Sequence, residues 1–338
     1  MPAAERLPAA TVTTDGAERL LAVGALTVHG RLTGASNAVL YASVSDGAEE
    51  LRCVYKPVAG ERPLWDFPDG TLAQREVASY EICRALGWDL VPPTVLREGP
   101  HGLGMCQQWI GPGPQEGPAG ADAEAYEPTD EATDDAADGP AGASGGHDRA
   151  DDPRAADHGD DHGDGDDHDD YDDHDDREPQ LLALVEADEP GPGWKAVGHA
   201  QVAPDRTALL VHADDPRLRR LAVLDAVINN ADRKGGHLLA PSGRELRAID
   251  HGVTFHTENK LRTLLWGWAG EPLPGEITAA LGRLEERLGD GGVLATRMAA
   301  LITAEELEAL RGRVAMLLTT GSHPLPGGDW PAIPWPLI

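Results

Sequence analysis

The sequence contains few aromatic residues, few cysteines and no long apolar run. Aromatic residues make up 4% of the chain, and there are three cysteines, Cys53, Cys83 and Cys106. An odd number of cysteines without metal-type spacing argues against a disulfide framework and favours reduced thiols in the cytoplasm. No stretch approaches the roughly 18 apolar residues that a membrane span needs, and the first residues show no signal-peptide pattern. We therefore expect a cytoplasmic protein without a transmembrane segment.

Basic residues are also scarce. The chain has 28 Lys and Arg against 58 Asp and Glu, a formal net charge of -30, so nucleic acid is not expected as a partner. Residues 111–180 contain 25 acidic and 3 basic residues, and no Val, Ile, Leu, Met, Phe, Trp or Cys. A segment with so little to bury is predicted to be a disordered insert. The remainder is long enough for a substantial core.

The second half of this insert is rich in aspartate, histidine and glycine. Five histidines lie among the aspartates: His147, His158, His162, His168 and His174. Such tracts bind Zn²⁺ or Ni²⁺ weakly, and an acidic arm can also bind a protein partner. The ligand positions of a calcium loop are only partly present, because His162 and Tyr171 stand where oxygen ligands are needed. A solvated acidic linker is the favoured interpretation.

The segment before the insert predicts a small β-rich lobe. Residues 21–30, 38–44 and 51–58 are expected to be strands, the first two joined by a tight Gly-rich hairpin, and 102–110 a buried strand. Residues 74–86 have helical periodicity and stop at Gly87.

After the insert the pattern becomes mainly helical. Asp215-Pro216 begins a helix that runs to about residue 230, and a loop and a short hairpin follow at 231–250. Further helices are expected at about 278–288 and 303–318. The predicted domains are a flexible N-terminus (1–20), a β-rich lobe (21–110), the insert (111–180), a mainly helical lobe (181–322) and an extended Pro/Trp-rich tail (323–338).

Four charged residues are notable for their positions. Lys56 lies on an apolar strand, where lysine is normally avoided, and Glu76 lies early on the next helix. Asp232 is in a polar loop between an apolar helix and a strand, and Asp250 ends the following strand. Phosphoryl transfer needs such a set: a fixed cation for the phosphates, metal-binding carboxylates and a group that orients the attacking hydroxyl.

Each of these residues also has an ordinary structural explanation when taken alone. Lys56 could extend to solvent from a strand end, and Glu76 could complement the helix dipole. Asp232 and Asp250 could simply form turns. Glu81 is an alternative partner for Lys56, although it lies on a different face of the helix.

In this order, the residues resemble the phosphatidylinositol 3-/4-kinase branch of the protein-kinase-like fold. That branch has an Asp-Arg-x-x-x-Asn loop, a short hairpin and an Asp-x-Gly metal motif. Here the loop reads DRKGGH over 232–237, and the metal motif is Asp250-His251-Gly252. The stretch REVASYEICRALGW…VPPT is similar to the Glu-bearing helix and next strand of type II-like phosphatidylinositol 4-kinases. More closely, the chain resembles an uncharacterised actinobacterial family of such kinase-like proteins, over about 20–110 and 181–320.

The resemblance implies an α+β, bilobal protein-kinase-like fold that uses ATP with Mg²⁺ or Mn²⁺. Lys56 would bind phosphate with Glu76 as its partner, Asp250 would be the main metal ligand, and Asp232 would be the catalytic aspartate. Arg233, beside it, could contact phosphate or pair with a nearby acid.

Two further groups of residues are implied only by the resemblance. The loop over the phosphates would comprise Gly34, Ala35, Ser36 and Asn37. The segment near the adenine would comprise Gln107, Gln108, Trp109 and Ile110. The acidic insert would then begin at the hinge between the two lobes.

His237 departs from the family pattern, because it stands where the second metal ligand is normally Asn. A neutral imidazole suits Mn²⁺ or Zn²⁺ better than Mg²⁺. The segment after Asp250 also has few cations for an anionic lipid headgroup.

Three functions are compatible with these residues. The favoured one is an ATP-dependent kinase that phosphorylates a hydroxyl of a protein, a small molecule or a lipid. The alternatives are a nucleotide-binding pseudokinase or scaffold with the acidic insert as its partner-binding arm, and a protein nucleotidyltransferase that uses the same cleft. A metal-handling protein built around the Asp/His tract is a more distant alternative.

Overall fold

The computed structural model describes residues 14–32, 37–68, 70–114, 180–203, 205–241, 243, 245–328 and 330–337. All of them belong to one compact unit. The insert predicted at 111–180 lies outside the described residues, apart from 111–114 and Gln180. Among the described residues, no helix combines the length and apolar character needed to cross a membrane. Cys53, Cys83 and Cys106 are all buried and unbridged.

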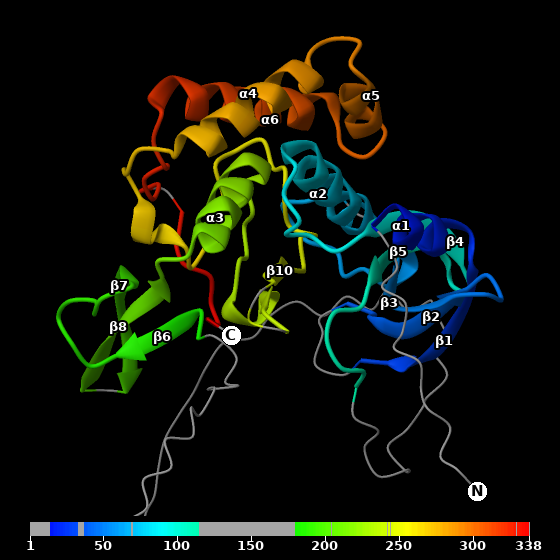
Figure 1. The fold of residues 1–338 in the computed structure, drawn as a ribbon, viewed down its shortest axis with the longest axis horizontal. Coiled ribbons are helices and arrows are strands. Elements are labelled where there is room, and N and C mark those ends of the chain that lie inside the picture. Colours follow the sequence, from blue (N-terminus) through cyan, green and yellow to red (C-terminus); the bar gives the residue numbers. More distant parts are fainter. Residues whose placement is uncertain are drawn as a thin grey trace, which may run out of the picture. The chain divides into compact units, whose positions relative to one another are not determined.

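The N-terminal part is a five-stranded antiparallel sheet with two helices (Figure 1). The strands are β1 (Ala25–Arg31), β2 (Leu40–Ser45), β3 (Glu50–Pro57), β4 (Thr94–Gly99) and β5 (Gly102–Gln108), in the spatial order β1-β2-β3-β5-β4. The helices are α1 (Thr14–Val23) and α2 (Leu72–Leu86). Gly87 ends α2 in the left-handed conformation, as predicted, with φ of 75°.

The two faces of this sheet pack against different helices. Leu20 and Leu21 of α1 pack with Cys53 and Tyr55 of β3, whereas Val77 of α2 packs with Val54 and with Met105 of β5. Because side chains alternate along a strand, Lys56 lies on the same face of β3 as Val54, towards α2. This alternation aims the lysine at the helix that carries Glu76.

Two predictions for the N-terminus are wrong. Residues 21–23, expected as strand, are the last turn of α1, and residues 14–20, expected as a flexible end, form its first turns. The buried side chains of Ala17, Leu20 and Leu21 recur at helical spacing and anchor the helix on the sheet.

The C-terminal part begins with a three-stranded sheet that the sequence did not indicate. Its strands are β6 (Leu182–Val185), β7 (Trp194–Ala203) and β8 (Arg206–Ala213), in the order β6-β8-β7. Helix α3 (Pro216–Ile228) follows, with the Asp215 side chain accepting a hydrogen bond from the Arg217 amide at 2.7 Å, which confirms the predicted cap. The predicted hairpin is present as β9 (Leu238–Leu239) and β10 (Arg247–Ala248).

Three helices complete this part: α4 (Gly275–Leu288), α5 (Val293–Ala299) and α6 (Ala304–Thr320). The first and last were predicted, and α5 was missed. Their apolar residues join those of α2 and α3 in the largest core of the described chain. The element order confirms the α+β class, with a β-rich N-terminal part and a mainly helical C-terminal part.

The tail after α6 is irregular, with several bends, and packs through its backbone. The Leu337 carbonyl accepts a hydrogen bond from the Gly235 amide at 2.8 Å, and the Ala332 carbonyl accepts one from the Thr263 amide at 3.1 Å. The Trp266 indole also donates to the Ala332 carbonyl at 2.8 Å. The tail therefore lies beside the loop that contains Asp232.

Candidate functional site

Lys56 and Glu76 form the centre of the candidate site. The Lys56 Nζ atom lies 2.7 Å from Glu76 Oε1, and the Glu76 side chain is almost fully buried. The other oxygen, Glu76 Oε2, accepts a hydrogen bond from the His251 amide at 2.8 Å. Glu81 pairs instead with Arg297 at 3.1 Å, so the alternative partner considered for Lys56 is wrong.

Asp250 reaches the same lysine from 194 residues away in the sequence. Its Oδ1 atom lies 3.2 Å from Lys56 Nζ, and its side chain is 51% exposed. Asp250 has a positive φ of 61°, a left-handed conformation that aspartate tolerates better than most residues. The backbone turn just after β10 therefore directs one face of this carboxylate to Lys56 and leaves the rest accessible.

The charges of these groups are strongly linked. Burial alone would lower the pKa of Lys56, but the carboxylates of Asp250 and Glu76 outweigh it and raise that pKa. The Lys56 ammonium in turn holds the pKa of Asp250 well below its ordinary value, with a smaller contribution from His237. Lysine and aspartate therefore both stay charged at neutral pH, as phosphate and metal binding require.

Asp232 lies in the loop between α3 and β9. Its backbone amide donates to Asn230 Oδ1 at 3.0 Å, and its Oδ2 atom lies 3.0 Å from Lys234 Nζ. Burial raises the pKa of Asp232, although the nearby Lys234 ammonium opposes the effect. A carboxylate with a raised pKa is a better general base than an ordinary aspartate.

Arg233 is placed differently from the sequence expectation. Its side chain is fully buried, and its guanidinium lies 3.0 Å from Asp225 Oδ1. The same guanidinium donates to the Ile249 carbonyl at 2.9 Å and contacts His251 Nε2 at 2.7 Å. A guanidinium enclosed in this way cannot contact a phosphate, so the catalytic role is wrong and the other expectation, pairing with a nearby acid, is the one observed. Arg233 instead connects the loop to the strand end that carries Asp250.

Asp225 is the residue that sequence reasoning missed. It is fully buried on α3 and accepts hydrogen bonds from Asn230 Nδ2 at 2.9 Å and Thr263 Oγ1 at 3.3 Å, in addition to those from Arg233. The available signal was an acidic residue within the apolar run LAVLDAVI, eight positions before Arg233. A buried acid normally requires a cationic partner.

His237 contacts Asp250 from the end of the same loop. The His237 Nε2 atom lies 3.4 Å from Asp250 Oδ2, and Nδ1 accepts a long hydrogen bond of 3.4 Å from the Lys234 amide. Burial lowers the pKa of His237 to about 4, so the ring is neutral at pH 7. With Nδ1 as acceptor, the proton of the neutral ring lies on Nε2 and faces Asp250.

These two side chains are the candidate metal ligands. Among the described residues, no group of three or more His, Cys, Asp or Glu side chains is placed to hold a metal ion. The donor set fits a cation that arrives with a nucleotide, because Mg²⁺ is commonly held by one or two carboxylates together with substrate phosphates. His237 can join Asp250 through Nε2 only in the other tautomer, at the loss of the Lys234 hydrogen bond.

The residues expected near the adenine follow β5. The Gln107 side chain is buried and donates to Thr94 Oγ1 at 2.8 Å, so it is not directed at a ligand. The amides of Gln108 and Trp109 donate to the carbonyls of Pro93 and Arg52, each at 2.9 Å. Within the described residues, the Ile110 amide has no hydrogen-bond partner.

The loop expected over the phosphates is only partly described. Gly34, Ala35 and Ser36 lie outside the described residues. Asn37 is described, and its Oδ1 atom accepts a hydrogen bond from the Arg62 amide at 2.8 Å. Asn37 therefore connects the end of this loop to the segment after β3.

Comparison with known proteins identifies a close relative. No family model matches the chain. The chain is 41% identical over 322 residues to Protein Rv2133c of Mycobacterium tuberculosis, and the match covers 95% of each protein. The chain belongs to the family of Protein Rv2133c.

Two solved structures are similar at much lower identity. The structure of hydra Fam20 with sugar has a TM-score of 0.44 and 12% identity, covering 92% of this chain and 88% of that one. The crystal structure of the Golgi casein kinase has a TM-score of 0.39 and 11% identity, covering 91% and 75%. Neither these two nor Protein Rv2133c is described as a phosphatidylinositol 3-/4-kinase, and membership of that branch stays a prediction.

Proposed function

We propose that this chain is an ATP-dependent phosphotransferase. The observation that carries the proposal is the convergence of Glu76 and Asp250 on the Lys56 ammonium, at 2.7 and 3.2 Å. A lysine fixed by a buried glutamate, beside a half-exposed aspartate, supplies the cation and the metal-binding carboxylate that nucleotide phosphates require. A purely structural ion pair would not need the second, accessible carboxylate.

The remaining groups have separate roles in this proposal. Lys56 binds the α- and β-phosphates, and Glu76 holds its side chain in place. Asp250, with His237 beside it, holds the divalent cation, Mg²⁺ or Mn²⁺, which neutralises phosphate charge when bound. The Ile110 amide is the donor available to the adenine base.

Asp232 acts on the acceptor. An acceptor hydroxyl oxygen forms a bond to the γ-phosphorus, while the bond from that phosphorus to the β,γ-bridging oxygen breaks and ADP leaves. The hydroxyl proton passes to the Asp232 carboxylate. Lys234, 3.0 Å from Asp232 Oδ2, holds that carboxylate in position.

A protein or an uncharged small molecule fits the acceptor role better than an anionic lipid. The segment after Asp250 has two long cationic side chains, Lys260 and Arg262. Lys260 is 2.6 Å from Asp66 and is buried between the Trp65 and Trp330 rings, which leaves Arg262 as the one long cation of this segment for a headgroup. A lysine that is already paired and enclosed is not available to a phosphorylated headgroup.

A nucleotide-binding scaffold is the second candidate, and His237 favours it. In the observed arrangement the His237 proton faces Asp250, where a second metal ligand would need a lone pair. Transfer of a nucleotidyl group from the same cleft is a third outcome that label tracing separates from both.

The test follows labelled ATP with the full chain in Mg²⁺ and in Mn²⁺. Label released or transferred from γ-labelled ATP supports the kinase, label transferred from α-labelled ATP supports the nucleotidyltransferase, and binding without either supports the scaffold. A ligand at 100 times its Kd stabilises the native state by about 2.7 kcal/mol, so binding is measurable as a rise in Tm. No rise in Tm with ATP in either metal would contradict all three.

Asp232→Asn gives a sharper test of the chemical step. The substitution keeps shape and hydrogen bonding but removes the base, so turnover should fall about 10²- to 10⁴-fold while ATP affinity changes little. Asp290→Asn, at an aspartate that is 98% exposed and far along the chain, is the matched control. Full activity in Asp232→Asn would remove this residue from the mechanism.

A further inference from the structure

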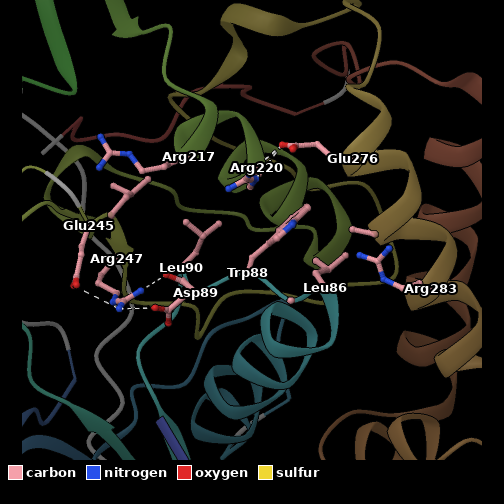
Figure 2. Close-up of a pocket in the computed structure, with 13 residues that line it drawn as sticks. Leu86, Trp88, Asp89, Leu90, Arg217, Arg220, Glu245, Arg247, Glu276 and Arg283 are labelled. Carbon is pink, nitrogen blue, oxygen red and sulfur yellow. Dashed lines mark hydrogen bonds and ion pairs between the residues drawn. The ribbon is translucent and has the colours of Figure 1, made fainter. Parts of the chain in front are cut away.

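An arginine-rich cleft lies on a different set of residues from the site described above. Its volume is about 520 Å³, within the range of small-molecule pockets. Its walls come from the end of α2, from α3, from the segment around β10 and from α4 (Figure 2). None of Lys56, Glu76, Asp232 and Asp250 lines it.

Trp88, just after α2, places its indole ring in this cleft. Gly87, in the left-handed conformation, turns the backbone, and Trp88 follows it. Figure 2 shows the Trp88 side chain in the middle of the lining residues, with Arg283 on one side and the Asp89–Arg247 pair on the other. Leu86, Leu90, Leu246 and Ala280 add apolar surface. A flat apolar group can stack on the indole in such a place.

The acidic residues of the cleft are already paired with arginines. Arg220 Nη2 lies 2.8 Å from Glu276 Oε1, and Arg247 Nη2 lies 2.7 Å from Asp89 Oδ2 and 3.5 Å from Glu245 Oε2. These pairs link α3 to α4 and β10 to the end of α2. Once they are made, Glu276, Asp89 and Glu245 leave little negative charge to repel an anion.

Two donors of the lining remain unused. Within the part of the chain that the structure describes, neither the Arg283 guanidinium nor the Trp88 indole N–H has a hydrogen-bond partner. Arg220 also keeps one guanidinium nitrogen free, because its bonds to Glu276 use only Nε and Nη2. An unpaired guanidinium prefers planar oxyanions, which it binds through two parallel hydrogen bonds.

We propose that this cleft binds a small organic oxyanion, a carboxylate or a phosphate monoester carried on a flat apolar group. The oxyanion pairs with Arg283 and the free nitrogen of Arg220, and the flat group stacks on Trp88. The proposal does not depend on the phosphotransferase activity. The cleft joins the end of the helix that carries Glu76 to the strand that precedes Asp250.

Titration calorimetry of the full chain with phenyl phosphate and with benzoate tests the proposal. Saturable binding of at least one probe is expected, and the stronger one identifies the headgroup. Inorganic phosphate and benzyl alcohol each supply half of the ligand, so both should bind much more weakly. Equal affinity for inorganic phosphate and phenyl phosphate would show that Trp88 takes no part, and the ligand class would be wrong.

Arg283→Gln is the decisive variant, since Arg283 is exposed and has no partner among the described residues, so its replacement should leave the fold intact. Loss of a charged hydrogen-bond pair should weaken probe binding at least about tenfold. Arg206→Gln, an exposed arginine of β8 outside the cleft, should leave the affinity unchanged. Unchanged affinity in Arg283→Gln, or displacement of the probe by saturating ATP, would overturn the proposal. Persistence of binding in Asp250→Ala separates this result from any failure of the kinase assignment.

Discussion

His237 is the residue that should decide which metal supports turnover. His237→Asn replaces an imidazole with an oxygen ligand, and it removes the Nε2 proton that faces Asp250. We predict that the ratio of Mg²⁺- to Mn²⁺-supported activity rises, without loss of turnover. The measurement is the rate in each metal at matched ATP saturation.

Tm, measured beside the metal ratio, distinguishes a metal-binding role of His237 from a purely structural one. If His237 only caps the short 3₁₀ helix Gly235–His237, the substitution changes Tm slightly and leaves the metal ratio as it was. That result would remove His237 from the site.

At the level of single residues, the sequence alone identified charged residues whose neighbours in the sequence are mostly apolar. Lys56, Glu76 and Asp250 were identified in this way, and the structure places them together. Arg233 was misjudged because a sequence does not show which side of a loop faces the core. Asp225 was overlooked because its partner, Arg233, lies in the loop after the helix, and the sequence does not show that the two side chains meet.

Helix α3 carries the acid that fixes the loop after it. Asp225→Ala would leave the Arg233 guanidinium buried without its counter-charge, and it would also remove the acceptor for Asn230 and Thr263. Breaking a buried ion pair from one side typically costs about 3–5 kcal/mol. We predict a loss of that size in the free energy of unfolding, measured with urea.

The control is another aspartate–arginine ion pair, one that is exposed to solvent. Asp290→Ala removes the partner of Arg311, but the Asp290 side chain is 98% exposed. Surface pairs contribute roughly 0–1 kcal/mol, so little change is expected. A loss in Asp225→Ala no larger than in Asp290→Ala would contradict a role for Asp225 in holding the loop.

Among the elements, those with local signals were predicted and those held by distant contacts were not. The Asp215-Pro216 start of α3 and the Gly87 end of α2 are local chemistry and appear as expected. Strand β7 (Trp194–Ala203) was missed because its burial pattern is irregular, interrupted by register shifts in its pairing with β8. Helix α1 was missed, with residues 14–20 expected as a flexible end and 21–23 as strand, because its buried face depends on the sheet beneath it.

For the whole molecule, the acidic insert should be dispensable for stability. Residues 115–179 contain no Val, Ile, Leu, Met, Phe, Trp or Cys that could join a core. We predict that replacing them with a short Gly/Ser linker between Pro114 and Gln180 leaves Tm within a few degrees of the parent. A protein that no longer unfolds cooperatively after the deletion would show that the segment contributes to the fold.

Acid should destabilise the molecule through two histidines that pack on Trp268. The rings of His212 and His323 lie 4.2 and 6.2 Å from the Trp268 ring centroid. His212 has no room for a second proton, because Nδ1 contacts the Ala213 carbonyl at 2.9 Å and Nε2 accepts from the Gly267 amide at 3.0 Å. A Cβ atom on Gly267 would approach His212 Nε2 to 2.5 Å, so only glycine allows this contact.

Burial lowers the pKa of His212, and it lowers the pKa of His323 to about 4. Histidine in the unfolded chain titrates near 6.5, so the unfolded state takes up protons first as the pH falls. The stabilisation is therefore complete above about pH 6.5 and is lost between there and about pH 4. We predict a falling Tm across this window, with a shallower fall in His323→Gln but not in His199→Gln. Parallel profiles for all three proteins would contradict the assignment.

The ribosome makes the Asp232 loop well before it makes the tail that bonds to it. Chains emerge from the N-terminus at about 5–20 residues per second, so the roughly one hundred residues between Gly235 and Leu337 take about 5–20 s to appear. During that interval the amides of Gly235 and Thr263 lack the carbonyls of Leu337 and Ala332. A nascent chain therefore contains Lys56, Glu76 and Asp250 before the backbone of the Asp232 loop has the hydrogen-bond acceptors of the tail.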